Sequence, residues 1–413
     1  MNLLLVTNQF PKKGGDSIFI EEEWKVLSKE FNHIVLVSRS KSQKVDVELP
    51  QNVTLYWYNG PNLISIIRLL PRIFSSRTRI ELKKAKNCSI KNYIKRFLDI
   101  VRFRLVELDF EGFVKNIELQ KDTIAYTYWI SGATLALLNQ RERLGFNKVV
   151  SRTHGAELYN ERCKGGWQPF RDIISEELDE IYFACEYGRK YFIRQWGNIN
   201  NKVREVAYLG SVTPQENHLI NATDDKKIVL LSCSRIISLK RIELIIQALE
   251  LIPDSLTLEW RHLGDGIEKN NIIKLSHEKL DKKKNVTWFI EGYLPHEELE
   301  AYYSKHGVNL FITTSSTEGG TPISMIEALS MGVPVIGTSV GGITEIIHDS
   351  SCGFLLSDNP TPQEICGAIC EYSETGIDMK NMLSRNAFSR WKEYYVAEDN
   401  AHEFVQKLVK SRN

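Results

Sequence analysis

The residues best suited to chemistry in this chain are two glutamates, Glu318 and Glu327, on either side of a glycine-containing turn. Residues 308–313 are a short apolar run, typical of a buried parallel strand. Pro322 and the apolar residues that follow it at helical spacing predict that a helix begins after the turn. Backbone N–H groups at a helix start suit a phosphate or sugar oxygen. The turn residues expected at this position are Gly319, Gly320 and Thr321.

The two glutamates are expected to do different things. Glu318 lies in the loop and can accept hydrogen bonds from ligand hydroxyls, whereas Glu327 lies within the helix and suits a vicinal diol such as a ribose. Each glutamate taken alone is more simply interpreted as a solvated loop acid or as an acid that complements the helix dipole. The whole segment instead favours a polyhydroxylated, phosphorylated ligand, and a nucleotide sugar fits that description.

Other polar residues follow apolar runs elsewhere in the chain. Arg235 and Lys240 follow the run 228–232 and precede an amphipathic helical pattern, so they flank a loop after a strand end. Fixed cations at such a loop would stabilise the negative charge of a departing diphosphate. His154 follows the run 149–151 and is expected at a strand's carboxyl end. An isolated histidine is usually structural, but this position favours a functional one.

The segment from Thr317 to Glu345 resembles the retaining nucleotide-sugar glycosyltransferases of family 4, which have the GT-B fold. It contains their Glu-Gly turn, proline, second glutamate followed by alanine, Gly-x-Pro-Val strand and Gly-Gly-x-x-Glu turn. One departure is that Glu318 and Glu327 stand one residue further apart than usual, an insertion that a glycine pair can absorb. The resemblance covers nearly the full chain and is strongest over residues 232–356.

The resemblance implies a role for each motif residue. Arg235 and Lys240 match an Arg-x4-Lys pair that neutralises the leaving nucleoside diphosphate, and Glu318 and Glu327 would face the sugar and the ribose. His154 matches a His-Gly-x-Asp motif, with Glu157 in place of the aspartate, and would contact the donor sugar. The remaining residues assigned to donor binding lie in loops and are Gly14, Gly15, Gly264, Tyr293, Leu294, Gly319, Gly320 and Thr321.

Two blocks of alternating strand and helix patterns position these residues. The expected strands are residues 3–6, 34–38, 124–126, 149–151 and 181–184, then 228–232, 256–263, 286–290, 310–313 and 335–337. This pattern predicts an α/β chain of two doubly wound Rossmann-like domains facing each other across a cleft. We expect an acceptor-side domain over 1–212, a linker at 213–227 and a nucleotide-sugar domain within 213–388. A C-terminal helix in 389–413 is expected, by the resemblance, to pack back on the first domain.

The amino-acid composition limits the kinds of partner and cofactor that the protein is expected to bind. The 413 residues are 42% hydrophobic and 25% charged, with a net charge of +1, which argues against a nucleic-acid partner. Seven cysteines without a Cys-x2-Cys pair indicate a reduced, cytoplasmic chain, and no apolar run approaches the ~20 residues that span a bilayer. No Asp-x-Asp at a strand end and no metal-spaced histidines or cysteines appear, so we expect no cofactor and no metal ion.

Residues 62–104 are biased, with an apolar stretch followed by many lysines and arginines. Two interpretations stay open. One is docking to an anionic membrane, at the inner face of the cell membrane, or to a lipid-diphosphate acceptor. The other is a set of solvated helix faces that cover the first sheet.

Together these features predict a metal-independent, retaining glycosyltransferase of the hexosyltransferase type. The resemblance implies a nucleotide diphosphate sugar as donor and a saccharide or lipid-linked saccharide as acceptor, in surface polysaccharide or lipid-linked oligosaccharide synthesis. A GT-B epimerase or phosphorylase is one alternative, although neither additional acid/base carboxylates nor a cofactor lysine is apparent. A non-catalytic scaffold that binds sugar nucleotides is another, which the altered glutamate spacing keeps open.

Overall fold

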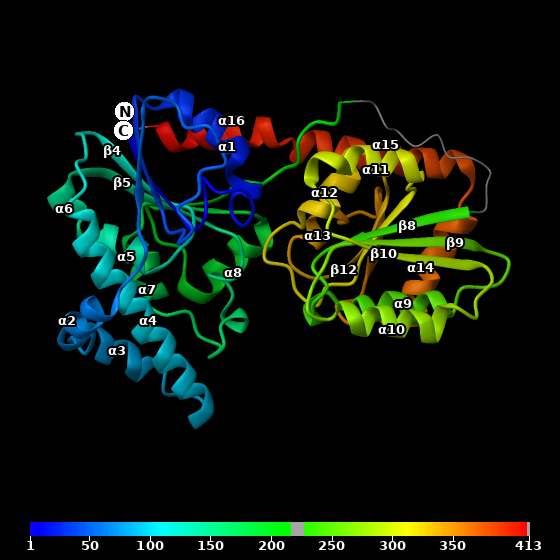
Figure 1. Ribbon diagram of the computed structural model, residues 1–413, viewed down its shortest axis with the longest axis horizontal. Coiled ribbons are helices and arrows are strands. Elements are labelled where there is room, and N and C mark those ends of the chain that lie inside the picture. The colour runs from blue at the N-terminus through cyan, green and yellow to red at the C-terminus, as the bar shows by residue number, and fades with distance from the viewer. Residues whose placement is uncertain (216–226, 411–413) are drawn as a thin grey trace. The chain divides into compact units, whose positions relative to one another are not determined.

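The computed structural model describes residues 1–215 and 227–410, and these residues form two compact α/β units (Figure 1). The first unit comprises Met1–Ala207 and the C-terminal residues from Ala401 onward, and the second comprises Tyr208–Asn400. Each unit contains one parallel sheet with helices on both faces. Alternation of strand and helix along the chain produces this layering, because parallel strands need crossover connections.

The sheet of the first unit has the strand order β3-β2-β1-β4-β5-β6-β7 and is parallel throughout. Its strands are β1 Asn2–Thr7, β2 His33–Ser38, β3 Val53–Trp57, β4 Thr123–Thr127, β5 Phe146–Thr153, β6 Glu180–Phe183 and β7 Val203–Val206. The chain order reverses between β1 and β4. Ligands of doubly wound sheets bind beside such a reversal, outside the carboxyl ends of the strands.

Helices cover both faces of this sheet. Alternate residues of β1 divide between them: Leu3 and Leu5 face α1 and α16, whereas Leu4 and Val6 face α4, α5, α7 and α8. The helices that contribute residues to this unit are α1 Ser17–Glu30, α2 Leu63–Ile73, α3 Ser76–Lys84, α4 Ile90–Val114, α5 Gly132–Asn139, α6 Arg141–Leu144, α7 Arg171–Glu177, α8 Glu186–Trp196 and α16 Ala397–Val409, with the 3-10 turn η1 Asn160–Arg162.

The sheet of the second unit repeats the arrangement with the order β10-β9-β8-β11-β12-β13. Its strands are β8 Lys227–Cys233, β9 Thr257–Leu263, β10 Val286–Gly292, β11 Leu310–Thr313, β12 Val335–Thr338 and β13 Gly353–Leu356. The order reverses between β8 and β11, which pair directly through Leu310 and Phe311. The loops after these two strands therefore flank the position where a doubly wound sheet binds its ligand.

Two helical layers also enclose the second sheet (Figure 1). One layer contains α9, α10 and α14, and the other contains α11, α12, α13 and α15. The helices are α9 Ile242–Glu250, α10 Lys269–Leu280, α11 Leu299–His306, α12 Ile323–Ser330, α13 Ile343–Ile346, α14 Pro362–Glu374 and α15 Ile377–Tyr394, with the 3-10 turns η2 Ser238–Lys240 and η3 His296–Glu298.

All ten strands expected from the sequence are present, with ends shifted by up to three residues. Three strands were not expected: β3, β7 and β13. Each lies at an edge of its sheet and contains partly or fully exposed positions, so it lacks the continuous apolar run of a central strand. The expected linker lies largely outside the described residues.

The C-terminal helix expected within 389–413 is interrupted in the structure. Helix α15 ends at Tyr394, and Val396 pairs with Ser211 in a short parallel bridge before α16 begins. The break separates two cores. Trp391 and Tyr395 pack in the second unit, whereas Phe404 and its neighbours in α16 pack in the first.

None of the helices in the described ranges is long and apolar enough to cross a bilayer. All seven cysteines are free thiols. Cys366 and Cys370, which share one face of α14, have sulfur atoms 4.0 Å apart.

Candidate functional site

Hydrogen bonds join the loops that follow β8 and β11, on either side of the reversal point. Arg241, which closes η2, donates from Nε to the carbonyl of Thr314 at 2.7 Å and from Nη2 to that of Ser315 at 3.0 Å. Thr314 Oγ1 in return donates to the carbonyl of Lys240 at 3.0 Å. Because the two loops follow adjacent strands and are joined by these hydrogen bonds, they are held close together.

The most direct contact between the loops joins Lys240 and Glu318. Lys240 Nζ donates to Glu318 Oε1 at 2.5 Å, although the residues are 78 positions apart. The side chains are 22% and 10% exposed, so the pair is largely shielded from water. A ligand phosphate that approached Lys240 would therefore meet an ammonium group already neutralised by a carboxylate, and would have to share or displace it.

The turn after Glu318 is shaped by a second glycine pair. A Cβ atom on Gly341, which has φ of +53°, would lie 2.4 Å from the carbonyl oxygen of Glu318. A Cβ on Gly342 would lie 2.7 Å from the amide nitrogen of Thr321. Only glycine allows this close approach, which fixes the backbone from Glu318 to Thr321. Pro322 then stands at the N-cap of α12, one position before the first turn in which it was expected.

Glu327 lies in α12, with a side chain only 10% exposed. Its Oε1 is 3.0 Å from Nδ1 of His296, which belongs to η3 after β10. Glu327 and Lys240 also act on a common neighbour, the thiol of Cys233 at the end of β8. Burial raises the pKa of that thiol to about 12; Glu327 adds to the shift and Lys240 opposes it. Both charges therefore act at the carboxyl end of β8.

Arg235 lies on the same loop as Lys240, and its side chain is exposed. The loop after β9 packs against this one, since a Cβ on Gly264 would lie 1.9 Å from the carbonyl oxygen of Ser234. Gly264 also donates its N–H to the carbonyl of Gly292, at the end of β10. Tyr293, next along the chain, is 79% exposed. Leu294 is partly buried against the apolar core of the same unit.

The structure thus brings Arg235, Lys240, Glu318 and Glu327 to the carboxyl ends of β8 and β11 within the second unit. Gly264, Tyr293 and Leu294 follow the neighbouring strands β9 and β10. The other predicted residues, His154, Gly14 and Gly15, belong to the first unit.

His154 follows β5 and is enclosed by aromatic rings, with centroids 4.2 Å away for Trp129 and 4.7 Å for Tyr128. Burial lowers the pKa of its imidazole, which favours the neutral form. Its Nδ1 lies 3.5 Å from Glu157 Oε1, whereas its Nε2 and the Tyr128 hydroxyl have no hydrogen-bond partner among the described residues. Buried polar atoms are rarely left unpaired, so this group is suited to a ligand or water. Glu157 accepts the N–H of His154 at 2.7 Å and orders the loop.

Gly14 and Gly15 precede α1 and both have positive φ values, +89° and +63°. Beside them, the buried carboxylate of Asp16 accepts the backbone N–H groups of Asn8, Gln9 and Phe10 at 2.6–3.1 Å. The loop after β1 is therefore held by a carboxylate of its own chain.

Three residues that the sequence did not single out complete the second-unit site: Arg241, His296 and His262. His262 in β9 is fully buried; its Nδ1 lies 2.8 Å from the Ser232 hydroxyl and its Nε2 3.2 Å from the carbonyl of Ser234. Burial lowers the pKa of His262 to about 4, so the ring is neutral and supports the loop of Arg235. No local spacing signal marked these residues, because their partners lie between 28 and 74 positions away.

Among residues 1–215 and 227–410, no group of three or more histidines, cysteines, aspartates or glutamates is arranged to hold a metal ion. The charges of the second-unit site come instead from lysine, arginine and glutamate side chains.

Comparisons with known proteins agree with this arrangement. Residues 214–390 match the family described as glycosyl transferases group 1. Over 74% of the chain, the sequence is 27% identical to the GtfA subunit of the UDP-N-acetylglucosamine--peptide N-acetylglucosaminyltransferase of Streptococcus agalactiae. It is 28% identical over 64% of the chain to TuaC of Bacillus subtilis, described as a putative teichuronic acid biosynthesis glycosyltransferase. The alignments span only 60% and 64% of those two proteins.

Solved structures resemble the whole chain. The Anabaena protein Alr3699/HepE in complex with UDP and glucose has a TM-score of 0.63 at 14% identity, covering 99% of both chains. The lipopolysaccharide outer core galactosyltransferase WaaB has a TM-score of 0.68 at 14% identity, covering 99% of this chain and 100% of that one. The protein therefore has the GT-B fold of two Rossmann-like domains. The match to glycosyl transferases group 1 falls within the second unit, which contains residues 214–390.

Proposed function

We propose that this protein is a retaining glycosyltransferase of family 4 that transfers a sugar from a nucleotide diphosphate sugar to an acceptor hydroxyl. The observation that carries the proposal is the assembly of Arg235, Lys240, Glu318 and Glu327 at the reversal point of the second sheet. Several curated relatives are named for polysaccharide synthesis, which supports an acceptor saccharide or lipid-linked saccharide in surface polysaccharide assembly.

Each residue has a proposed part in the reaction. Arg235 and Lys240 hold the diphosphate, and their charge stabilises it as it leaves. Glu327 accepts the ribose hydroxyls, and Glu318, released from Lys240, accepts hydroxyls of the sugar together with the turn at Gly319, Gly320 and Thr321. His154, neutral because it is buried, can donate a hydrogen bond to the donor sugar. By the family resemblance, we propose that the bond between the sugar and the diphosphate breaks as the acceptor oxygen bonds to the sugar on the same face. The departing diphosphate then takes the proton of the acceptor hydroxyl, and no protein nucleophile takes part.

The proposal is tested by incubating the protein with a panel of nucleotide sugars and measuring thermal stabilisation and release of nucleoside diphosphate. A ligand that binds the folded protein raises its free energy of unfolding by mass action, by about 2.7 kcal/mol at a concentration one hundred times Kd. The melting temperature rises accordingly. We expect one donor to give both signals. Stabilisation without release would indicate a scaffold instead. Absence of both signals across all common donors contradicts the proposal.

A chelator is expected to leave the reaction unaffected, because lysine and arginine side chains supply the positive charge at the diphosphate. Turnover with the identified donor would be measured before and after treatment with excess EDTA. A rate within twofold of the untreated protein is the expected result. Loss of turnover that added Mg²⁺ or Mn²⁺ restores would contradict the metal-independent mechanism.

We also propose that the first unit docks on the anionic inner face of the membrane through α2. Leu63, Ile67, Leu70 and Phe74 recur at helical spacing on one side of α2 and its C-cap, and they are 73%, 60%, 45% and 46% exposed. The opposite side of the helix packs on α4 through Leu69 and Ile73. An outward apolar stripe of this kind marks an interaction surface.

Charge favours a lipid partner for this stripe. Several cations of the region have structural partners: Arg72, Arg77 and Arg104 bind acids of α4, Lys84 binds Asp172, and Arg96 binds backbone carbonyls. A second set makes no ion pair within the described residues, and consists of Arg79, Lys83, Lys86, Lys91 and Lys95. Such unpaired cations beside exposed apolar residues suit anionic headgroups over an apolar interior.

Binding to lipid vesicles tests this surface. The protein is expected to float with phosphatidylglycerol–phosphatidylcholine vesicles and much less with phosphatidylcholine alone. Replacing Leu63 and Ile67 together by glutamate should reduce flotation about tenfold, since two exposed apolar contacts are lost and two negative charges gained. The matched control replaces Ile377 and Met379 of α15, which are also exposed, by glutamate. Equal flotation of both double variants would exclude α2 as the contact.

A further inference from the structure

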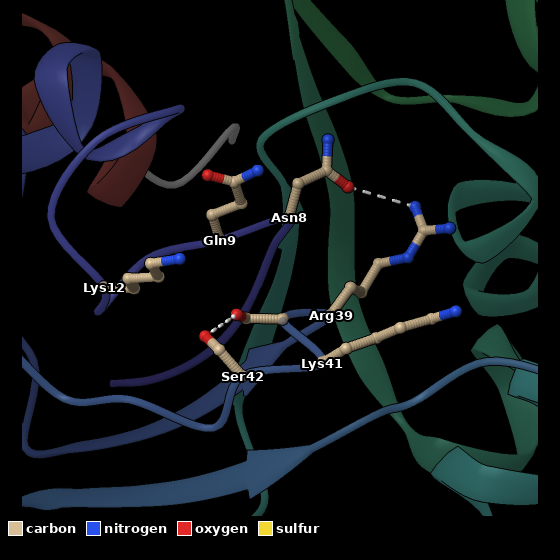
Figure 2. Close-up of a pocket in the computed structure, with 7 residues that line it drawn as sticks. Asn8, Gln9, Lys12, Arg39, Lys41 and Ser42 are labelled. Atoms are coloured by element: carbon tan, nitrogen blue, oxygen red, sulfur yellow. Dashed lines mark hydrogen bonds between the residues drawn. The ribbon is translucent and has the colours of Figure 1, made fainter.

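The first unit contains a polar cavity of about 560 Å³ at the carboxyl ends of β1 and β2. Figure 2 shows the side chains that line it: Asn8, Gln9 and Lys12 from the loop after β1, and Arg39, Lys41 and Ser42 from the loop after β2. Ligand sites commonly have volumes of about 300–1,000 Å³. The cavity also stands one strand away from the reversal point between β1 and β4, on the edge of the sheet where ligands bind.

The cavity wall carries three cations and no acid. Lys12, Arg39 and Lys41 line it, and none of the three has a carboxylate within 4 Å in the described part of the chain. The remaining lining atoms are amides and hydroxyls, including Ser40 and Ser42, whose oxygens lie 2.9 Å apart. A wall of this composition favours a hydroxylated anion over an apolar or cationic ligand.

Among the three cations, Arg39 gives the most direct indication of the ligand's charge. Burial lowers the pKa of the half-buried guanidinium group, and Tyr58 and the Asp16 carboxylate oppose this shift without forming an ion pair with it in the described part of the chain. Its Nη1 donates only to neutral oxygens, Asn8 Oδ1 at 3.2 Å and Ser131 Oγ at 3.5 Å. A desolvated arginine normally has an anionic partner. The guanidinium fork matches the oxygens of a phosphate, which would supply that partner.

The two loops are fixed before any ligand arrives. The carboxylate of Asp16 holds the amides of Asn8, Gln9 and Phe10, and the Arg39 amide donates to the carbonyl of Thr7 at 3.1 Å. In Figure 2 the Arg39 and Lys41 side chains extend in the same direction from the loop after β2. Cations held by an ordered backbone need little reorganisation to bind an anion.

We infer that this cavity binds the phosphoryl group of a phosphorylated saccharide acceptor, with Arg39 as the fork and Lys12 and Lys41 as flanking charges. The inference rests on the proposed transferase function and narrows its acceptor to a class. Two sources share this chemistry, a free sugar phosphate and a saccharide linked to a lipid diphosphate. The hydroxyls of Ser40 and Ser42 and the side-chain amides of Asn8 and Gln9 line the cavity and are positioned to contact the sugar.

Calorimetric titration tests the inference with two probes, glucose 1-phosphate and a short-chain prenyl diphosphate. Both are titrated into the Lys240→Ala variant, in which the proposed donor diphosphate site is disabled, so that binding reports the first unit. We expect saturable binding that Arg39→Gln and Lys41→Gln each weaken at least tenfold. Lys41 is exposed, so its variant is expected to fold even if the Arg39 variant does not. Tighter binding of one probe identifies the source.

Lys44→Gln is the matched control, because Lys44 lies on the same segment, is 65% exposed and pairs with Asp46 outside the cavity. It should bind the probes as the parent does. Donor-induced thermal stabilisation of Arg39→Gln in the otherwise unchanged chain separates the two proposals, since it should persist if the donor site lies in the second unit. Probe binding that is absent, or equal in Lys41→Gln and Lys44→Gln, overturns the inference while leaving the donor site untouched.

Discussion

Replacing Lys240 by alanine is expected to lower kcat about 10³-fold, which corresponds to about 4 kcal/mol of transition-state stabilisation. The structure holds Lys240 at the reversal point through the contact of its Nζ with Glu318 and through the hydrogen bond that its carbonyl accepts from Thr314 Oγ1. Its removal takes a positive charge from the departing diphosphate. It also leaves Glu318 as an uncompensated negative charge near the same oxygens. Steady-state kinetics with the identified donor measure the effect.

Lys227→Ala is the matched control for this variant. Lys227 begins the same strand, β8, and makes an ion pair of similar geometry with Glu259 at 2.9 Å, but at the opposite end of the strand. It should retain near-normal kcat, because exposed ion pairs contribute little to stability and this one is remote from the reversal point. If Lys240→Ala were as active as Lys227→Ala, the diphosphate role of Lys240 would be wrong.

Replacing His154 by phenylalanine should lower kcat about 10²-fold, by removing hydrogen bonds that only the imidazole can make. Phenylalanine keeps a flat ring against Trp129 and Tyr128, so the packing around position 154 is preserved. The protein should therefore melt close to the parent temperature while turning over far more slowly. Kinetics and thermal unfolding on the same preparation separate these two effects.

The control for this variant is His33→Phe. His33 lies at the amino end of β2, away from the loops that follow the strands, and its Nε2 lies 3.0 Å from the Thr54 hydroxyl. Its replacement should leave kcat unchanged. A His154→Phe variant with full activity would assign His154 to packing, despite a buried Nε2 that has no hydrogen-bond partner among the described residues.

The central strands could be predicted from the sequence because parallel strands covered on both faces are continuous apolar runs, as in residues 228–232. The edge strands β3, β7 and β13 could not, because exposed positions interrupt runs of only four or five residues, whereas the edge strand β10 is seven residues long and was predicted. The break between α15 and α16 also escaped prediction. The break arises because Tyr395 packs in the core of the second unit and Phe404 in the core of the first. The apolar pattern within 389–413 does not show that the two residues belong to different cores.

The sequence allowed the residues of the candidate site to be proposed, but not the contacts between their side chains. The loop positions of Arg235, Lys240 and Glu318 and the helix position of Glu327 followed from strand-turn-helix patterns and from the family resemblance. The pairing of Lys240 with Glu318 did not, since it depends on the adjacency of β8 and β11 in the folded sheet. The same holds for His296 beside Glu327 and for Arg39 in the cavity of the first unit, whose partners are remote in sequence.

The central claim is that the loops after β8 and β11 bind a nucleoside diphosphate, and a structure of the protein with that ligand bound tests it most directly. The account predicts phosphate oxygens within hydrogen-bond distance of Lys240 Nζ and the Arg235 guanidinium group. It also predicts the ribose hydroxyls on the Glu327 carboxylate. A nucleotide bound elsewhere, with these side chains still facing solvent or one another, would contradict it.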